Sequence, residues 1–489
     1  MNLRLTTKTG LTIMPIRLAH SALLLISLLL LSSCGPRSST TADSQPARNV
    51  ILFIGDGMGV STVTAARIFD GQSKGLSGEE HVLSFERFPH VALVKTYNTN
   101  QQVPDSAGTV TAMLTGEKTR AGLINVGPDA LRQSCDGALE NRLEPITERA
   151  RREGKAVGVV TTTRLTHATP AGMYAWTPER DWEDNRYIDP ADQRKGCRDI
   201  AWQLLNHPNG GLDIAMGGGS RHFFGLDRLG ERPGATDDLV RDWLAKGRDR
   251  IYISSADQLD GLTTDQQVLG LFASSHMAYE AQKPEDSMEP SLTEMATTAV
   301  RLLNERDSDY FLMVEGGRID HAHHDSKPGY ALVETQELAN AVAAVLDMVD
   351  TRETLVMVTA DHSHVFTLGG YPTRGNPILG HVMKNDSFGE PTGEADLAAD
   401  GQPYTTLSYA NGPGAVRDLP RPAPETGIEM VAQSLLPVAS LERDGSLDYD
   451  ETHAGEDVVL YAIGPGSESV KGVIEQNLIY DIMIDAFGW

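Results

Sequence analysis

Uninterrupted apolar runs, most of which end in glycine or an acidic residue, constrain the fold of this chain more than any other feature. They alternate with segments whose apolar residues recur at helical spacing. Strands that are apolar on both faces are typical of a parallel sheet covered by helices on two sides. The sequence therefore predicts an α/β fold with a large, mainly parallel central sheet flanked by helices. The runs that predict strands lie at 49–57, 156–160, 212–219, 310–317, 354–362 and 457–464, and the helical patterns at 60–69, 146–152, 292–304 and 330–348.

Residues 371–450 differ in composition from the segments around them. They are rich in glycine, proline and polar residues, and they contain no pattern for a long helix. We expect them to form a small inserted subdomain within a core that spans residues 49–370 and resumes at 451–489. Hydrophobic residues make up 40% of the chain, which is enough for such a core.

The N-terminus carries the pattern of an export signal. Lys8 and Arg17 precede the apolar run 22–31, which is too short to span a bilayer as a helix. The sequence LSSC that ends at Cys34 resembles a bacterial lipobox, in which the cysteine is lipidated after cleavage. We therefore expect residues 1–33 to be a lipoprotein signal peptide. An ordinary signal peptide followed by a chance cysteine is the alternative.

The segment after this signal, residues 34–48, is small, polar and contains proline. Such a composition is typical of a flexible tether. Gly35, directly after the lipidated cysteine, indicates sorting to the outer membrane, so we expect contact with the membrane only through the N-terminal lipid. A start at Met14 would give a shorter signal peptide, and the sequence leaves open both starts and both membrane faces.

Beyond Cys34 the chain has two cysteines, Cys135 and Cys197. In an exported protein an isolated pair is typical of a disulfide. Two free thiols and a metal-binding pair are the alternatives, although neither cysteine has a second ligand at metal-binding spacing.

The formal net charge is −25. A surface this acidic repels polyanions, so the sequence argues against nucleic acid and anionic membrane surfaces as partners. It also repels phosphate, so any phosphate site in this chain needs strong local positive charge.

Side chains that can bind metals gather directly after the predicted strands. In open α/β sheets, ligand sites form outside the carboxyl ends of the strands, so residues far apart in sequence meet in one crevice. Each residue alone is more typical of a turn or a helix cap, and it is their common placement that indicates a site. The residues are Asp56, His167, Thr169, Glu315, Asp361 and His362.

The segment EGGRIDHAHHDS, at 315–326, concentrates the same chemistry. Three of the chain's 14 histidines lie within this segment, at positions 321–324. Asp320 and His324 are four residues apart, so on a helix they share a face and suit one metal ion. His364 lies close to the Asp361–His362 pair. Mixed carboxylate and imidazole ligands suit zinc, whereas sites made only of oxygen suit magnesium.

The motif VPDSAGT, at 103–109, places Ser106 at the expected start of a helix with Asp105 as its N-cap. The dipole and the free N–H groups of a helix N-terminus favour an alkoxide and an incoming phosphate. The alternative is that Ser106 is itself only a cap. No histidine near it in sequence forms an obvious general base, so a metal must activate this serine.

Together these segments resemble the alkaline phosphatase family, and most closely its animal-type branch. The matching stretches follow the family's order from Asn49 to the C-terminus: NVILFIGDGMGVSTVTAARI, VPDSAGT, TTTRLTHATPAGMYA, VEGGRIDHAHH, TADHSHVF and ETHAGEDV. The resemblance implies hydrolysis of phosphate monoesters through a phosphoserine, with two zinc ions and one magnesium ion, in a homodimer.

The resemblance also implies a role for each residue of the site. Ser106 is the expected nucleophile, and Arg180 is the expected bidentate clamp on the phosphate. His167 and His321 are expected just outside the metals. The expected metal ligands are Asp320, His324 and His453 for one zinc, Asp56, Asp361 and His362 for the second zinc, and Asp56, Thr169 and Glu315 for magnesium.

Cys135 and Cys197 fall where the animal-type branch has a disulfide. Two features depart from that branch. Animal members carry a calcium site with an acidic residue directly after a phenylalanine, whereas Phe272 is followed by Ala273, so we expect this site to be lost or weak. The chain also stops at Trp489 without the hydrophobic tail that precedes a glycolipid anchor, and the N-terminal lipid is the expected substitute.

Two other classes of function compete with this interpretation. A phosphodiesterase or a sulfatase of the same superfamily would share the metal ligands, but sulfatases need a modifiable Cys or Ser in another motif and diesterases often use Thr. A non-catalytic lipoprotein that binds phosphate or metal would be expected to lack Ser106 or a ligand, yet all are present. The natural phosphomonoester substrate is not identified by the sequence.

Overall fold

The computed structural model describes residues 45–489, except 208, 235–236, 417–420 and 442–446. The predicted signal peptide, the lipidated Cys34 and most of the predicted tether lie outside the described residues. Among the helices that the structure describes, none is both long enough and apolar enough to cross a membrane.

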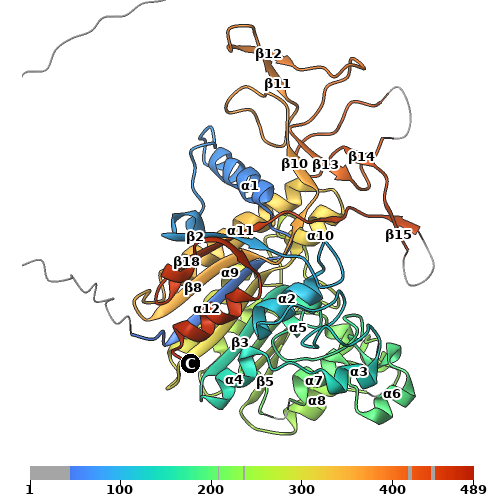
Figure 1. The fold of residues 1–489 in the computed structure, drawn as a ribbon, viewed down its shortest axis with the longest axis vertical. Helices are drawn as coiled ribbons and strands as arrows, with labels where there is room; N and C mark the ends of the chain where they lie inside the picture. Colours follow the sequence, from blue (N-terminus) through green and yellow to red (C-terminus); the bar gives the residue numbers. More distant parts are fainter. Residues whose placement is uncertain (1–44, 208, 235–236, 417–420, 442–446) are drawn as a thin grey trace, which may run out of the picture. The chain divides into compact units, whose positions relative to one another are not determined.

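A ten-stranded sheet forms the centre of the molecule, in the order β19-β2-β18-β8-β1-β7-β3-β4-β6-β5 (Figure 1). All neighbouring pairs are parallel except the two made by β18 with β8 and β2. The predicted mainly parallel α/β sheet is therefore confirmed. The strands are β1 (Asn49–Gly55), β2 (His90–Lys95), β3 (Ala156–Arg164), β4 (Ile214–Gly218), β5 (Arg250–Ile253), β6 (Gln267–Leu271), β7 (Tyr310–Gly316), β8 (Thr354–Ala360), β18 (Val458–Ile463) and β19 (Gly472–Glu475).

The four strands at the two ends of this sheet, β19, β2, β6 and β5, were not predicted from the apolar runs. Each is short, and β2 alternates between buried and exposed residues. A half-exposed strand such as β2 shows no continuous apolar run, because only every second side chain faces the core.

Helices cover both faces of the sheet (Figure 1). On one face α1 and α9 pack against α11, and on the other α4 and α12 pack against α2. The helices are α1 (Val60–Ser73), α2 (Ser106–Thr115), α3 (Cys135–Glu140), α4 (Ile146–Arg152), α5 (Ala168–Ala171), α6 (Pro190–Lys195), α7 (Ile200–Leu205), α8 (Leu239–Leu244), α9 (Leu292–Asn304), α10 (Arg318–His324), α11 (Pro328–Leu346) and α12 (Leu478–Ala486).

The region of the predicted insertion forms small sheets in place of long helices. Strand β13 pairs with β10 and β14, β11 pairs with β12, and β15 pairs with β16. Residues 45–489 form one compact unit, so a separate subdomain at 371–450 stays a prediction. The short strands are β9 (Ser363–His364), β10 (Phe366–Leu368), β11 (Met383–Asn385), β12 (Pro391–Ala395), β13 (Leu407–Asn411), β14 (Ser434–Leu436), β15 (Ala439–Leu441), β16 (Leu447–Tyr449) and β17 (His453–Ala454).

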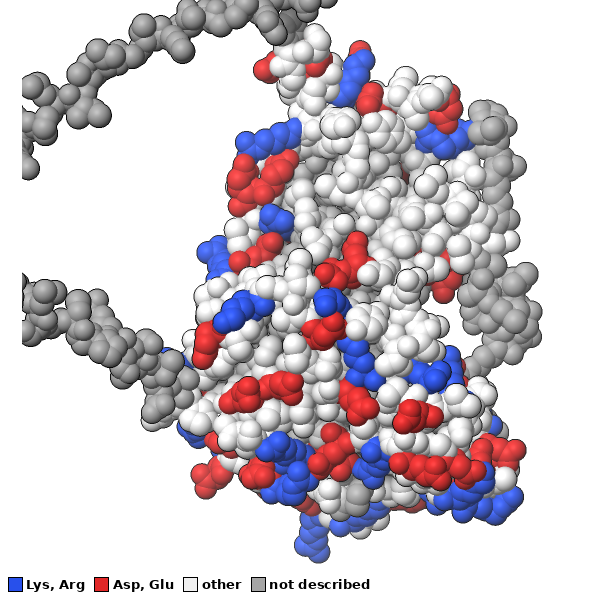
Figure 2. Space-filling view, viewed as in Figure 1, with Lys and Arg blue, Asp and Glu red and all other residues white. Residues whose placement is uncertain are grey.

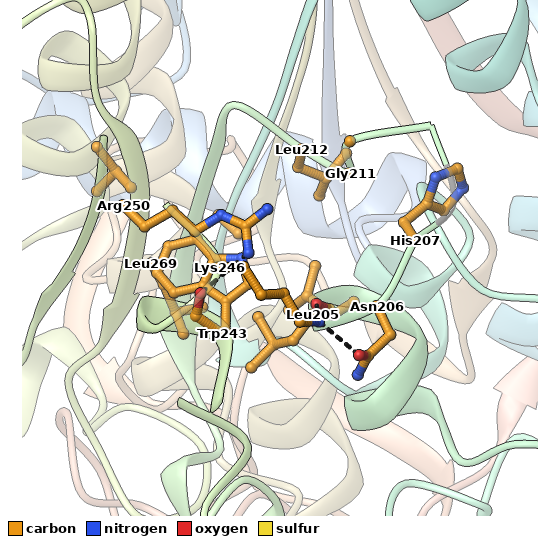
Figure 3. A pocket seen from close by; sticks show the side chains of 13 residues that line it. Leu205, Asn206, His207, Gly211, Leu212, Trp243, Lys246, Arg250 and Leu269 are labelled. Carbon is orange, nitrogen blue, oxygen red and sulfur yellow. Dashed lines mark hydrogen bonds between the residues drawn. The ribbon is translucent and has the colours of Figure 1, made fainter. Parts of the chain in front are cut away.

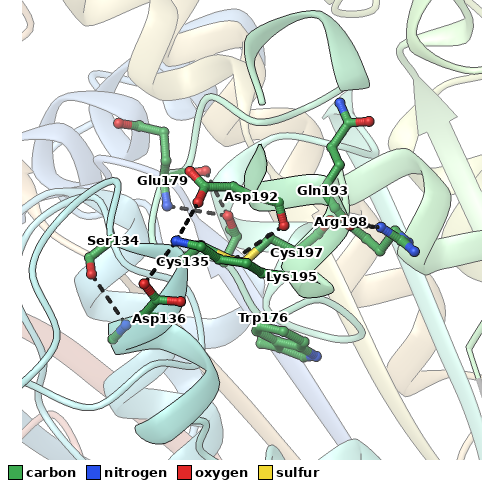
Figure 4. The surroundings of a disulfide bond; sticks show 12 residues. Ser134, Cys135, Asp136, Trp176, Glu179, Asp192, Gln193, Lys195, Cys197 and Arg198 are labelled. Carbon is green, nitrogen blue, oxygen red and sulfur yellow. Dashed lines mark hydrogen bonds and ion pairs between the residues drawn. A yellow bond between two sulfur atoms is a disulfide. The ribbon is translucent and has the colours of Figure 1, made fainter. Parts of the chain in front are cut away.

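A disulfide joins Cys135, at the start of α3, to Cys197, just before α7 (Figure 4). Both cysteines are buried and pack with Trp182 and Ile188 in a small apolar cluster outside the main core. Of the three states that the sequence left open for this pair, the structure has the disulfide.

We expect the disulfide to stabilise the fold strongly. Its cysteines are 62 residues apart, and closing a loop of that length removes about 4 kcal/mol of chain entropy from the unfolded state. The double variant Cys135→Ser, Cys197→Ser should therefore lose about 4 kcal/mol in the free energy of unfolding, measured by urea denaturation. The wild-type protein under reducing conditions is the control, and a loss below about 1 kcal/mol in both would contradict this prediction.

Candidate active site

The site lies where neighbouring central strands end, at the carboxyl edge of the sheet. Asp56 directly follows β1, Glu315 is the second-last residue of β7, and Asp361 directly follows β8. Strand β1 lies between β7 and β8, so the three carboxylates meet side by side. All three are fully buried. The structure therefore brings these three sequence-predicted residues together.

A first ligand group surrounds Asp320 on α10. Its Oδ1 atom lies 3.4 Å from Nε2 of His324 and 3.5 Å from Nε2 of His453. The two Nε2 atoms are 3.1 Å apart. Asp320 and His324 lie one helical turn apart on α10, as predicted, and the pairing of β17 with β9 brings His453 to them from far along the chain. One carboxylate and two imidazoles at this spacing suit a zinc ion.

The outer nitrogens of both histidines are held by backbone carbonyls. Nδ1 of His324 lies 2.6 Å from the carbonyl oxygen of Glu451, and Nδ1 of His453 lies 2.8 Å from that of Pro104. A carbonyl oxygen can only accept a hydrogen bond, so each Nδ1 must carry the N–H. Each Nε2 then directs its lone pair at the position between the ligands. Metal-binding histidines are commonly oriented by this second hydrogen bond.

His364 lies beside the first group, with its ligand atom close to those of Asp320, His324 and His453. Its Nε2 lies 2.9 Å from Oδ1 of Asp320, and its Nδ1 contacts the carboxylate of Glu451. The histidine therefore links two carboxylates and orients Asp320. The sequence showed His364 beside the ligands. Glu451 is the first residue of the matching stretch ETHAGEDV, but its contact with His364 could not be predicted from the sequence.

A second ligand group joins the nucleophile to the metal ligands. Nε2 of His362 lies 3.4 Å from Oδ1 of Asp56, 3.3 Å from Oδ2 of Asp361 and 3.2 Å from Oγ of Ser106. Oδ1 of Asp361 also accepts hydrogen bonds from the backbone N–H groups of Gly57 and His362. No histidine lies beside Ser106 along the sequence. His362 is 256 positions away in the chain, so only the fold could reveal the contact.

A third group is rich in oxygen, as a magnesium site requires. Both carboxylate oxygens of Asp56, Oε1 of Glu315 and Oγ1 of Thr169 are buried without a hydrogen-bond partner. Buried polar atoms are nearly always paired, so several orphaned oxygens in one place indicate that a cation belongs there. The second carboxylate oxygen of Glu315 is bound by the hydroxyls of Thr161 and Thr163.

Burial and mutual repulsion strongly perturb these carboxylates. Burial, together with the neighbouring charge of Asp361, raises the pKa of Asp56 well above its ordinary value. Burial likewise raises the pKa of Glu315 to about 8. Such shifts show that the carboxylates cannot all stay ionised by themselves, and divalent cations would remove this penalty.

Ser106 is the first residue of α2 and is buried. Asp105 caps the helix as predicted, because its Oδ1 accepts a hydrogen bond of 3.1 Å from the backbone N–H of Gly108. The serine hydroxyl therefore lies at a helix N-terminus, where the dipole favours negative charge.

Arg180 is anchored beside this helix start. Its guanidinium donates a hydrogen bond of 3.2 Å to Oδ2 of Asp105 and lies 3.1 Å from Nε2 of His167. Burial, together with the charge of Arg180, lowers the pKa of His167 to about 3, so this imidazole is neutral. Arg180 is thus placed next to the nucleophile, as the resemblance implied.

A third histidine joins the two that the sequence placed outside the metals. The ring of His276 lies 4.0 Å from that of His321 and 5.5 Å from that of His167, measured between centroids. Its Nε2 contacts the guanidinium of Arg164, which in turn is paired with Glu183. The sequence gave no signal for His276, because it lies alone in a loop after β6.

A separate group of possible ligands is formed by Asp184, His222 and Glu231. The guanidinium of Arg186 bonds to both Asp184 and Glu231. An arginine therefore already balances these carboxylates. The predicted loss of calcium binding at Ala273 stays a prediction.

Comparisons with known proteins agree with this site. A family model described as "Alkaline phosphatase" matches residues 47–488. The tissue-nonspecific alkaline phosphatase of Gallus gallus is 41% identical over 455 residues, covering 88% of this chain and 83% of that protein. The corresponding human isozyme is 40% identical over 458 residues, covering 89% and 83%. An alkaline phosphatase of Gadus morhua is 39% identical over 463 residues, covering 90% and 92%.

Solved structures show the same fold. The alkaline phosphatase of Thermus thermophilus superposes with a TM-score of 0.63 at 25% identity, covering 93% of this chain and 95% of that one. The enzyme of the Antarctic bacterium TAB5 superposes with a TM-score of 0.61 at 22% identity, covering 91% and 99%. From the family match over nearly all described residues, and from relatives of about 40% identity, the chain belongs to the alkaline phosphatase family of phosphomonoester hydrolases.

Proposed function

We propose that this enzyme hydrolyses phosphate monoesters through a phosphoserine on Ser106, with two zinc ions and one magnesium ion. The observation that carries the proposal is the convergence of three ligand groups on one buried serine. These groups contain buried oxygens without a hydrogen-bond partner and imidazole nitrogens whose lone pairs point between the ligands. Both features are expected of metal ligands.

The donor chemistry assigns the metals. Asp320, His324 and His453 would hold one zinc, and Asp56, Asp361 and His362 would hold the second. Asp56 would also share a magnesium ion with Thr169 and Glu315, since that group is made of oxygen. When bound, these ions supply the positive charge that lowers the pKa of the serine and neutralises the phosphate dianion.

The chain's own residues perform the two displacements. Oγ of Ser106 attacks phosphorus, and its new bond forms as the bond to the leaving alcohol breaks. Arg180 donates N–H groups to the phosphate oxygens and is held in position by Asp105. Water then cleaves the phosphoserine, which releases inorganic phosphate and restores the serine.

The rival within the superfamily is a phosphodiesterase. Turnover of an aryl phosphate monoester compared with the matching diester separates the two, and the proposal requires preference for the monoester. Arg180 beside Ser106 favours a terminal phosphate, whose two charged oxygens match the guanidinium fork.

We further propose an exported, lipid-anchored homodimer. Support for the anchor at Cys34 comes from the sequence pattern alone, and we place the protein at the outer membrane. Support for the dimer comes from large apolar side chains in the region of the insertion: Tyr371, Phe388 and Leu435 are 89%, 88% and 79% exposed. Figure 2 shows charged side chains more widely spaced at the end of the molecule that carries β10–β14 than at the opposite end.

Chelation should abolish activity and also destabilise the fold. Without cations, the buried carboxylates of Asp56, Glu315, Asp320 and Asp361 repel one another, so the melting temperature should fall by several degrees. Zinc and magnesium together should restore both quantities. Activity and melting temperature are measured on protein whose metal content is known by elemental analysis, with metal-saturated chelator as the control. Full activity of metal-free protein would contradict the proposal.

Ser106→Ala should lower kcat by a factor on the order of 10³ or more and remove all covalent labelling by radioactive phosphate. The matched control is Ser467→Ala, which removes a buried hydroxyl bonded only to the carbonyl of Gly464 and should leave activity unchanged. Labelling of another residue in the Ser106 variant would refute the assignment of the nucleophile.

His321→Lys should strengthen product inhibition. Burial, together with Arg318, lowers the pKa of His321 well below its ordinary value, so the native imidazole is neutral and holds phosphate weakly. A lysine adds positive charge near the phosphate. We expect about tenfold tighter inhibition by inorganic phosphate, or about 1.4 kcal/mol, and a lower kcat at alkaline pH if product release limits turnover.

The neutral variant His321→Gln is the control and should leave phosphate inhibition near the wild-type value. An inhibition constant that does not change in the lysine variant from neutral to alkaline pH would show that His321 only orders water. An unchanged pre-steady-state burst would show that product release is not limiting.

A further inference from the structure

A cavity of about 260 Å³ lies between α7 and the segment that runs from α5 towards Arg180. None of the catalytic or metal-binding residues lines it. Its walls carry two indole rings and several nitrogen donors. The residues that matter here are Arg142, Trp176, Arg198, Trp202, Asn206 and His207.

Each indole is paired with an arginine. The guanidinium of Arg142 lies 5.5 Å from the ring centroid of Trp176, and that of Arg198 lies 5.3 Å from the ring centroid of Trp202. Such cation–π pairs hold a positive charge beside a flat apolar surface. Within the described residues, neither indole N–H makes a hydrogen bond to the protein, so both remain available as donors. No carboxylate lines the cavity.

The walls are held rigidly from behind. The side-chain amide of Gln203 accepts a hydrogen bond of 3.1 Å from the backbone N–H of Trp176 and donates to the backbone carbonyls of Trp176 and Arg198, each at 3.0 Å. The disulfide fixes Cys197, the residue before Arg198, and Trp176 packs against the same cysteine cluster (Figure 4). A pre-formed cavity of this kind loses little entropy when a ligand binds.

Charge distinguishes the two arginines. Arg142 is already paired with Glu148. Among the described residues Arg198 has no carboxylate partner, and its Nη1 donates only to the carbonyls of Gln193 and Cys197. An exposed guanidinium without a counter-ion, at a cavity that offers donors and no acidic group, matches a ligand that supplies negative charge.

Two neighbouring cavities share residues with this one. A cavity of about 100 Å³ shares Asn206 and His207, and in it Nζ of Lys246 donates to the carbonyl of Leu205 and to Oδ1 of Asn206 (Figure 3). A more open cavity of about 610 Å³ shares Arg198 and Trp202. Its buried cation, Arg232, is bound to Asp199. The 610 Å³ cavity thus has the same indole and unpaired cation, but the carboxylate of Asp199 lines it, whereas no carboxylate lines the middle cavity.

We propose that this cavity is a second ligand site, which binds a small planar aromatic anion. The aromatic ring lies against Trp202, and the anionic group, a carboxylate or sulfonate, accepts hydrogen bonds from Arg198. Binding here is separate from phosphate binding at Ser106, because the two sites share no residue.

Calorimetric titration with naphthalene-2-sulfonate tests the proposal, on metal-loaded protein whose active site is saturated with inorganic phosphate. We expect naphthalene-2-sulfonate to bind saturably. Cyclohexanesulfonate, which lacks the aromatic ring, and neutral 2-naphthol, which lacks the anionic group, should not bind in this way. Arg198→Gln and Trp202→Leu should each weaken binding of the naphthalene probe by about tenfold. Both should keep wild-type turnover of an aryl phosphate, because neither residue touches the catalytic groups.

Arg248→Gln is the matched control, since Arg248 is exposed and lines none of the three cavities. This variant should bind the probe as the wild-type protein does. Absence of saturable binding, equal binding of cyclohexanesulfonate, or unchanged affinity in Arg198→Gln would each overturn the proposal. Displacement of the probe by inorganic phosphate would place it in the active site and would overturn the proposal as well.

Discussion

The interaction on which the rest of this structure depends is repulsion among four buried carboxylates, those of Asp56, Glu315, Asp320 and Asp361. Like charges about 4 Å apart repel by about 4 kcal/mol per pair at an effective dielectric constant near 20. The chain already carries a net charge of −25, so its surface does not offset the buried negative charge. The arrangement is stable in ionised form only if divalent cations share the crevice, and the same cations make it attractive to a phosphate dianion.

The order of the sheet explains how this arrangement is held. Strands β8, β1, β7 and β3 are neighbours at the centre of the sheet, and most of their residues are fully buried. Parallel strands bring their carboxyl ends to one edge, so Asp56, Glu315 and Asp361 are fixed by the most rigid part of the core. Helix α10 then adds Asp320 and His324 from the turn after β7. The site needs no loop to close before its ligands are in place.

Much of this could be predicted from the sequence, because buried central strands and their polar ends leave a local pattern. The continuous apolar run of β7 and the spacing of Asp320 and His324 on one helix face are such patterns. Residues that act through distant contacts leave none. The role of His276 and the approach of His362 to Ser106 depend on how the chain returns to the site. The half-exposed β2 was missed for a different reason, since its alternation is too short to stand out from a loop.

The contact between His453 and Pro104 couples the position of the first ligand group to that of the loop that carries Ser106. The imidazole of His453 belongs to the first ligand group, and its Nδ1–H is held by the carbonyl of a residue two positions before Ser106. Any shift of the loop that carries the nucleophile must therefore also turn a metal ligand. At the same time His362 contacts Ser106 directly from the second ligand group. The serine is thus positioned from both sides by residues of the two proposed ligand groups, which is the arrangement expected where metal ions, and no separate base, prepare the nucleophile.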